Sequence, residues 1–279
     1  MCNTIETYQK SDPTHTLTLR STFAGKFRKR FRDLRGELRD GIVDKDIFGL
    51  QTNFQRKELA GQPPRKQLDD FDQQLQALIV AYIIGNRWTD SFIGEAYRAG
   101  LMRAVAELKK AGYDMRQLDS SPAMMMALNS PPYKQAMELL KDDTASELKG
   151  ITDSMRQKIM RVVRELRTGG ASRGELADEV NGIITGNSDR KTGQSTEYKS
   201  KLLAYTSIVT AYNRAAWLAY KQAGAEQVGV EVEFVTAGDL RVCPICESLE
   251  GSIYPIDEAQ TLIPVHPLCR CFLLPLPLN

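Results

Sequence analysis

Histidine and cysteine are scarce in this chain of 279 residues, which holds two histidines and five cysteines. Long apolar runs are also missing, because the longest, around Leu78 to Ile84, is far shorter than the ~20 residues that a membrane-spanning helix needs. The N-terminal segment lacks the apolar core of a signal peptide, so we expect synthesis and retention in the cytoplasm, with no membrane contact. We therefore expect the cysteines to be thiols and not disulfides.

An excess of either charge is missing as well. The chain has 37 Lys and Arg against 35 Asp and Glu, so a polycation that coats nucleic acid along its whole length is excluded. Apolar residues make up 42%, which is enough to bury a core and excludes a wholly disordered chain. The length allows one large domain or two modest ones.

One segment departs from this charge balance. Between residues 20 and 40, eight Lys or Arg face three acids, a local net charge of +5. Apolar side chains recur every three or four positions from Leu19 to Ile42, which predicts one buried helix face and basic remaining faces. A basic face gains by releasing counterions from DNA, but it can also be a solvated face of a bundle helix. The candidate residues for contact with DNA or an acidic partner are Lys26, Arg28, Lys29, Arg30, Arg32 and Arg35.

The apolar periodicity predicts further helices. They are expected over 67–84, about 90–111, about 133–168, about 173–184 and about 195–223. In the first of these, the expected apolar face consists of Phe71, Leu75, Leu78 and Tyr82, and Thr89 is the expected N-cap of the second. Ser172 and Glu175 have the spacing of a capping box, and Gly224 is expected to end the last helix.

Two stretches break the helical pattern. Residues 113–132 contain three prolines and are expected to be a loop, in which Met124, Met125 and Met126 form either an adaptable contact surface or a buried turn. After residue 227 the period changes to two, which is typical of β-strands.

The fold class expected from these patterns is mainly α, an elongated helical body followed by a small Cys-rich β module, α+β overall. The expected divisions are a polar leader over 1–18, a helical body over 19–226 and a zinc-knuckle β module over 227–279.

Four of the five cysteines and one of the two histidines lie in that module. The order is Cys243-x2-Cys246, nineteen residues, then His266-x2-Cys269-x-Cys271. Two pairs of this kind bring four ligands together around a tetrahedral zinc ion, and a small module gains stability from such a link. We therefore expect a structural zinc site made from four of these five side chains, with Cys269 and Cys271 as alternatives for one place.

Other interpretations of the cluster stay open. A C-P-x-C pair also occurs in redox-active dithiols, but that use favours a first cysteine at a helix N-terminus, and the flanks here predict strand and loop. Disulfides could form after cell lysis. If one of the four side chains is not a ligand, a catalytic zinc with an open position becomes possible.

The C-terminal motifs resemble the head morphogenesis family of tailed phages, which includes the Mu F-like and SPP1 gp7-like minor head proteins. The resemblance is densest in T-A-G-D-L-R-V-C-P-I-C-E-S-L-E-G from Thr236 to Gly251, and in I-P-V-H-P-L-C-R-C from Ile263 to Cys271. It extends more weakly to Asn213 and to the segment Trp88–Gly100. Many relatives carry Arg-Thr-Glu where this chain has Tyr-Thr-Ser, starting at Tyr205.

The resemblance implies a low-copy structural protein of the phage head, assembled in the host cytoplasm and carried in the virion. Its implied partners are the portal protein and, further, scaffold or major capsid protein and the packaged double-stranded DNA. No catalytic constellation stands out, so we expect no enzyme. A metal-dependent enzyme or nuclease acting on DNA and a host zinc-module regulator are the alternatives.

Overall fold

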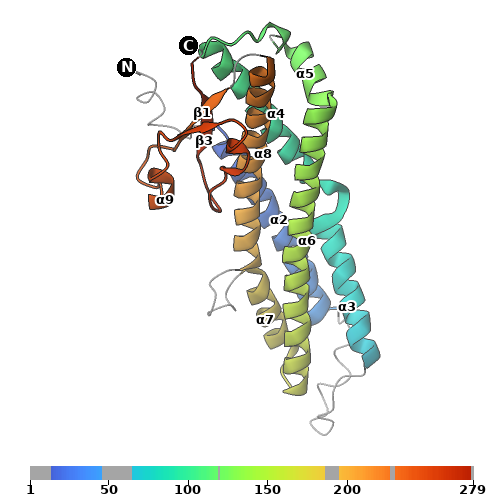
Figure 1. Cartoon of the computed structure of the whole chain (residues 1–279). Coiled ribbons are helices and arrows are strands. Elements are labelled where there is room, and N and C mark those ends of the chain that lie inside the picture. The colour runs from blue at the N-terminus through green and yellow to red at the C-terminus, as the bar shows by residue number, and fades with distance from the viewer. Residues whose placement is uncertain (1–13, 46–64, 119, 186–194, 227–229, 278–279) are drawn as a thin grey trace. The chain divides into compact units, whose positions relative to one another are not determined.

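The structure is a computed structural model that describes residues 14–45, 65–118, 120–185, 195–226 and 230–277 (Figure 1). The expected fold class is confirmed, since most of these residues are helical and a small antiparallel sheet lies near the C-terminus. The described helices are α2 (Leu17–Val43), α3 (Arg65–Ile79), α4 (Asp90–Lys110), α5 (Ser121–Asn129), α6 (Pro131–Thr168), α7 (Arg173–Thr185), α8 (Thr196–Glu226) and the single turn α9 (Pro244–Glu247). The strands are β1 (Glu231–Val235), β2 (Ile253–Pro255) and β3 (Phe272–Pro275).

The chain forms two compact units. The first unit comprises Met1–Phe23, Thr89–Thr144 and Ala204–Asn279, so it contains α4, α5 and the whole sheet. The second unit comprises Ala24–Trp88 and Ala145–Leu203, and it contains α3 and α7. The expected divisions near residues 18 and 227 stay predictions. Among the described helices, none has both the length and the apolar character needed to cross a membrane.

The apolar stripe of α2 is buried as its spacing predicts. Phe27, Phe31 and Leu34 are at most 1% exposed, because positions three and four apart share one face of a helix. Arg20, which the pattern assigns to the basic faces, is instead fully buried and lies over the Tyr205 ring. Aromatic contact can hold a buried guanidinium, which a pattern of charges alone does not reveal.

The buried face of α3 includes Phe71 and Leu75 as expected, but it differs from the expected face further along the helix. Ile79 and Ile83 are buried, whereas Leu78 and Tyr82 are only half-buried. The helix changes into a π turn at Val80–Ile84. Because a π turn is wider than an α-helical turn, residues four apart stay on one face over a longer stretch of chain. The spacing of apolar residues indicated the helix but not this change of pitch.

The helix ends are set partly by the expected caps. Ser172 and Glu175 form the predicted capping box, since the Ser172 N–H donates to the Glu175 carboxylate at 2.7 Å and the Glu175 N–H donates to Ser172 Oγ at 3.2 Å. Thr89 precedes α4 as expected, but its side chain makes no capping hydrogen bond and is buried instead.

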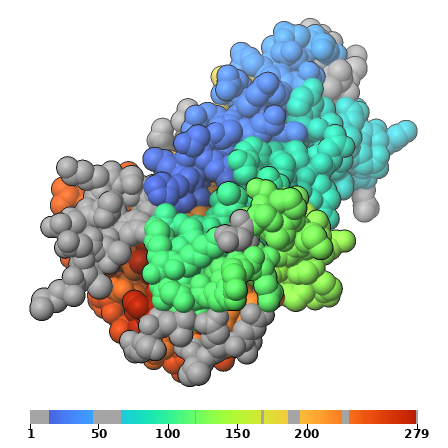
Figure 2. All heavy atoms as spheres, turned by 90° about the horizontal axis from the view of Figure 1, so that it is seen from above, coloured from blue at the N-terminus to red at the C-terminus, as the bar shows by residue number. Residues whose placement is uncertain are grey.

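The stretch 113–132 is not the expected loop, because it contains α5. Pro122 stands in the first turn of this helix, where no backbone N–H is needed, and the Ser120 side chain caps it by accepting from the Ala123 N–H. In the space-filling view α5, coloured green, lies at the surface (Figure 2). Met125 and Met126 are correspondingly 46% and 75% exposed.

The last long helix continues past its expected end. Gly224 lies inside α8, which ends at Glu226, so the expected stop is wrong. A Cβ at Gly224 would lie 3.0 Å from Val230 Cγ2, which is a tight approach. Gly224 therefore allows the chain at Val230 to pack closely against α8, and it does not end the helix.

Candidate metal centre

The sheet positions both segments that carry the candidate metal ligands at one of its ends. Its strand order is β2-β1-β3, and both pairings with β1 are antiparallel. Val235, the last residue of β1, pairs with Phe272, the first residue of β3. The chain leaving β1 and the chain entering β3 therefore lie side by side, which brings Cys243 and Cys246 toward the segment that ends at Cys271.

The first segment forms a tight turn around a sulfur atom. Cys243 is the N-cap of α9, and its Sγ accepts the Cys246 N–H at 3.3 Å. Pro244 fits the first position of the turn because no backbone donor is needed there. The expected strand-and-loop flank is thus wrong: Cys243 does begin a helical turn, although one of only four residues.

The second segment, from His266 to Cys271, also begins with a tight turn. The Cys269 N–H donates to the His266 carbonyl at 3.1 Å, and Leu268 has a positive φ of 66°. The His266 Nδ1 lies 2.7 Å from the Pro267 carbonyl oxygen, so Nδ1 carries the proton and donates. This bond leaves Nε2 as the atom with a free lone pair, which is the arrangement that metal-binding histidines use.

The five side chains form two overlapping triads. His266 Nε2 lies 3.2 Å from the Sγ atoms of both Cys243 and Cys246, and these three atoms form the outer triad. Cys246, Cys269 and Cys271 form the inner triad, whose sulfur atoms all lie within 4.8 Å of one another. Cys246 belongs to both triads. The inner triad is at most 3% exposed, whereas Cys243 and His266 are half-buried.

Hydrogen bonds and burial lower the pKa values of two thiols in the cluster and raise those of the other two. The Cys246 N–H lowers the pKa of Cys243, and the hydrogen bond from Cys271 lowers the pKa of Cys269 to about 5. Burial raises the pKa of Cys246 to about 12. The hydrogen bond that Cys271 shares with Cys269, together with burial, raises the pKa of Cys271. A cluster of this kind has thiolate character in part, and a bound cation would take the place of the remaining protons.

The pKa of the His266 imidazole is also shifted by its surroundings. Burial of the His266 ring favours its neutral form, but the hydrogen bond to the Pro267 carbonyl and the neighbouring thiols outweigh burial and raise its pKa. Protons therefore compete with a metal ion for this ligand as the pH falls.

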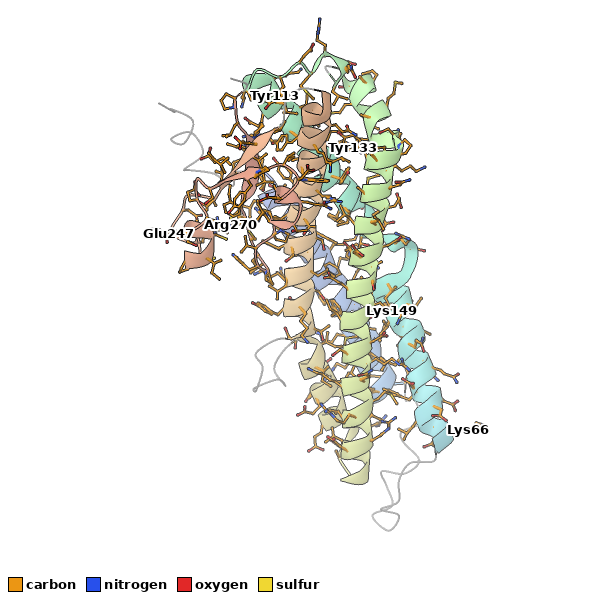
Figure 3. All side chains as sticks on the ribbon, viewed as in Figure 1. Lys66, Tyr113, Tyr133, Lys149, Glu247 and Arg270 are labelled. Atoms are coloured by element: carbon orange, nitrogen blue, oxygen red, sulfur yellow. The ribbon has the colours of Figure 1, made fainter. Side chains whose placement is uncertain are left out.

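A charged clamp joins the two segments next to the sulfur atoms. Asp239 precedes the first turn, and Arg270 lies between Cys269 and Cys271. Arg270 donates to both carboxylate oxygens of Asp239, at 2.7 and 2.5 Å. Arg241 also donates to Asp239 Oδ2, at 2.8 Å through Nη2, so the carboxylate forms a second ion pair beside the cysteines. These donors hold the pKa of the Asp239 carboxyl well below its usual range. Figure 3 shows Arg270 within this module and Glu247 on α9.

The family model described as Phage Mu protein F like protein matches residues 156–274, less than half of the chain. This segment is therefore similar to the phage Mu protein F like family. The match includes both turns, the clamp, all of α8 and the sheet up to Leu274, and it confirms the family resemblance expected from the cysteine motifs. No curated protein and no solved structure matches the chain. The family is one of structural phage head proteins, which fits the expectation of a head component.

Within the Mu F-like segment, α8 holds the module through one polar stripe. Asn213 Nδ2 donates to the Cys271 carbonyl at 3.3 Å, and Trp217 Nε1 donates to the Ile256 carbonyl at 2.8 Å. One turn further, the Tyr220 hydroxyl lies 3.2 Å from the Leu273 carbonyl. Spacings of four and three residues put these side chains on one helix face. The sequence did not reveal this contact for Trp217 and Tyr220, because their acceptors are backbone carbonyls that any residue carries.

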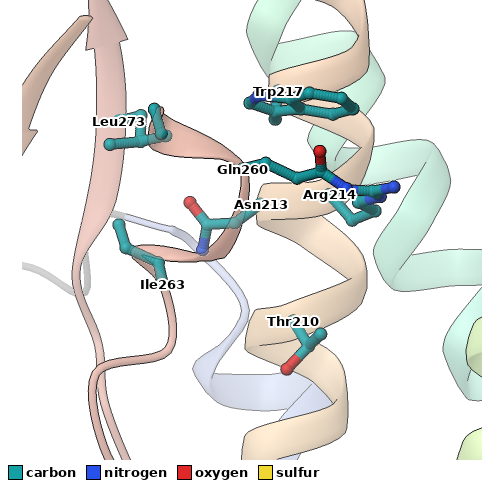
Figure 4. Close-up of a pocket in the computed structure, with 8 residues that line it drawn as sticks. Thr210, Asn213, Arg214, Trp217, Gln260, Ile263 and Leu273 are labelled. Atoms are coloured by element: carbon teal, nitrogen blue, oxygen red, sulfur yellow. The ribbon is translucent and has the colours of Figure 1, made fainter. Parts of the chain in front are cut away.

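A small cavity of about 30 Å³ lies beside that stripe (Figure 4). It is lined from α8 by Asn213, Arg214 and Trp217, and Gln260 comes from the opposite loop. The Arg214 guanidinium stacks on the Trp217 ring at 4.4 Å, and with its oxygen turned toward Arg214 the Gln260 amide accepts at 2.6 and 2.9 Å. The volume is about that of one water molecule, so this cavity is a packing gap at the docked module and not a substrate pocket.

The candidate DNA-binding residues divide into two groups. Arg28 pairs with Glu197 at 2.9 Å, and Arg30 donates to the Tyr82 carbonyl at 2.6 Å and stacks on Trp88. Both are therefore engaged within the second unit. Among the residues that the structure describes, the other four make no ion pair, and three of these four are exposed. The exposed ones are Lys26, Lys29 and Arg32, and the half-buried one is Arg35. Figure 2 shows that α2, coloured blue, reaches the surface.

Proposed function

We propose that this chain is a low-copy structural protein of a tailed-phage head, bound at the portal vertex and facing the capsid interior. The observation that carries this proposal is the Mu F-like match over α8 and the Cys-rich module. The family match indicates a phage head protein and a place in the virion, and the proposal adds the vertex, the low copy number and assembly in the host cytoplasm. Portal protein is the main partner, with scaffold or major capsid protein as further neighbours.

We also propose that the module is held by one structural zinc ion. Three ligands would be Cys243, Cys246 and His266, and Cys269 or Cys271 would be the fourth. The donor set fits, because the His266 Nε2 lone pair is free and points at two sulfur atoms 3.2 Å away. Thiolates and imidazole are the ligands of structural zinc sites, and four protein ligands leave no position for substrate. When bound, the ion would link the turn after β1 to the turn before β3.

The exposed cations of α2 support a contact with packaged DNA. Lys26, Lys29 and Arg32 are the side chains that would meet phosphates, since they are exposed and not committed to ion pairs among the described residues. Contact through phosphates alone would be independent of base sequence.

Binding to the portal protein is the direct test. The chain should co-purify with the portal protein of the same phage when the two are expressed together, and virions should contain it in far fewer copies than the major capsid protein. Absence from purified virions, measured by quantitative mass spectrometry, would contradict the proposal. Protein purified without chelator should hold about one zinc per chain, measured by elemental analysis.

A further inference from the structure

A tetrahedral site needs four ligands, and this cluster has five. The surplus ligand is a thiol, and it lies on the buried side. Cys246, Cys269 and Cys271 are 2%, 1% and 3% exposed, and their sulfur atoms are mutually within 4.8 Å. The inner triad is thus a complete set of three sulfur donors before any contribution from Cys243 or His266.

The surroundings of the inner triad keep these sulfur atoms in place. The Cys271 carbonyl is bound by Asn213 from α8, and Arg270, between the two cysteines, is held by both oxygens of Asp239. Cys246 lies in the turn that the Cys243 sulfur caps, and its N–H donates to that sulfur. Each of the three cysteines is therefore fixed by backbone and neighbours, and little rearrangement is needed to bring three sulfur atoms around one ion.

The two triads differ in the chemistry that they favour. The outer triad contains an imidazole nitrogen and is half-exposed, which suits zinc. The inner triad contains sulfur only and is closed to water, which suits a soft ion such as Cu(I), because thiolates select soft metals. Since both triads use Cys246, an ion at the inner position removes a ligand from the outer one.

We infer that the Cys246–Cys269–Cys271 triad is a second metal position, which binds a soft, thiophilic ion of the Cu(I) type in place of zinc. It shares the proposed metal centre but does not require that zinc occupies it. In this mode three thiolates coordinate the ion, their protons are released, and His266 is not a ligand.

The test is a competitive Cu(I) titration of the full chain under anaerobic conditions, with a chromophoric Cu(I) chelator as the competitor. All proteins in this titration carry Cys2→Ser, which removes the remaining thiol. With no further substitution, the chain should bind one Cu(I) and release any zinc in the same proportion. Cys269→Ser and Cys271→Ser should each weaken Cu(I) binding by at least about 10- to 100-fold. That is the loss of metal affinity when a residue that only hydrogen-bonds a ligand is removed, and these variants remove a ligand itself. His266→Ala should leave Cu(I) affinity within about threefold while weakening zinc binding, because imidazole is not a ligand of the soft ion.

The pattern separates this inference from the zinc proposal. Zinc binding should depend on His266 and on only one of Cys269 and Cys271, whereas Cu(I) binding should depend on both cysteines. Equal loss of Cu(I) affinity in His266→Ala and in the two serine variants would overturn the inner position. Wild-type protein that binds Cu(I) by this pattern but holds no zinc would overturn the zinc proposal alone.

X-ray absorption of the Cu(I)-loaded wild-type chain provides a measurement without any variant. A spectrum fitted by three sulfur neighbours supports the inner triad. A spectrum that requires an imidazole nitrogen overturns it.

Discussion

Asp239 joins the two turns of the Cys-rich module through its carboxylate. Its carboxylate accepts from Arg270, which stands between two cysteines, and from the backbone N–H and guanidinium of Arg241. A bidentate guanidinium–carboxylate pair fixes orientation as well as distance. Asp239 therefore positions the segment that carries Cys269 and Cys271 although it is not itself a candidate ligand.

Replacing Asp239 by Asn should lower the thermal stability of the metal-free protein in a pH-dependent way. The folded state holds the pKa of Asp239 below its ordinary value of 3.8, mainly through Arg270. Its contribution is therefore fully present above that ordinary pKa and is lost as the pH falls through the lower pKa of the folded state. The melting temperatures of wild type and Asp239→Asn, measured by calorimetry with chelator present, should differ at pH 7 and converge toward pH 2.

A matched control for this prediction is Asp257→Asn. Asp257 pairs with Lys221 at 2.9 Å, but its side chain is 75% exposed, and exposed pairs contribute little. Equal pH dependence in the two variants would contradict a special role for Asp239.

In the first unit, α4 and α8 approach each other closely at Gly100. A Cβ at Gly100 would overlap the Tyr212 carbonyl group, with the carbonyl carbon 2.8 Å away. The helices are that close because no side chain stands between them. Gly150, in α6, instead faces open space.

These two glycines predict opposite effects of the same substitution. Gly100→Ala should destabilise the protein by about 1–3 kcal/mol, because α4 must move away from α8 to admit the methyl group. Gly150→Ala should stabilise it by about 0.5–1 kcal/mol, because alanine is the better helix former and meets nothing. Urea unfolding of both variants measures the difference, and a stabilised Gly100→Ala would show that the two helices are not packed as described.

The helices also show what a sequence pattern can and cannot predict. The α2 stripe and the Ser172 capping box follow from local spacing, and both are confirmed. The α5 helix and the continuation of α8 through Gly224 were missed, because Pro and Gly were interpreted as breaks. Pro is tolerated in the first turn of a helix, and Gly224 is explained by a neighbour that the spacing does not show.

For the molecule as a whole, each unit contains one of the two tryptophans. Trp217 donates to the Ile256 carbonyl of the module, whereas Trp88 donates to the Ile83 carbonyl at 2.7 Å in the second unit. Removing the metal should loosen the module on α8, so chelation should shift the fluorescence of Trp217 in a Trp88→Phe variant. Trp88 in a Trp217→Phe variant should not respond. An equal response of both tryptophans would mean that metal loss unfolds the whole chain.

The basic segment of α2 makes a second prediction for the whole molecule. Replacing Lys26, Lys29 and Arg32 by Gln should weaken binding to duplex DNA of any sequence. It should also reduce the slope of log affinity against log salt by about 2–3, since each phosphate contact contributes about 0.9. Fluorescence anisotropy at several salt concentrations measures that slope.

The control for that experiment removes the same charge elsewhere on the surface. A triple Gln variant at Lys109, Lys134 and Lys149, all of them exposed, should keep the wild-type slope. If both triple variants lower the slope equally, net charge and not the α2 surface explains the binding.

The sequence by itself determined the mainly helical class, most of the helix positions, the family and the set of five candidate ligands. These depend on local periodicity and on rare residue types at short spacing, which need no knowledge of distant contacts. Tertiary structure decided which of the basic residues stay exposed and how the five ligands divide into two triads around Cys246. It also decided that Asp239 and α8 hold the module. Those outcomes depend on pairing β1 with β3 and on carbonyls far away in the chain, so only the folded chain specifies them.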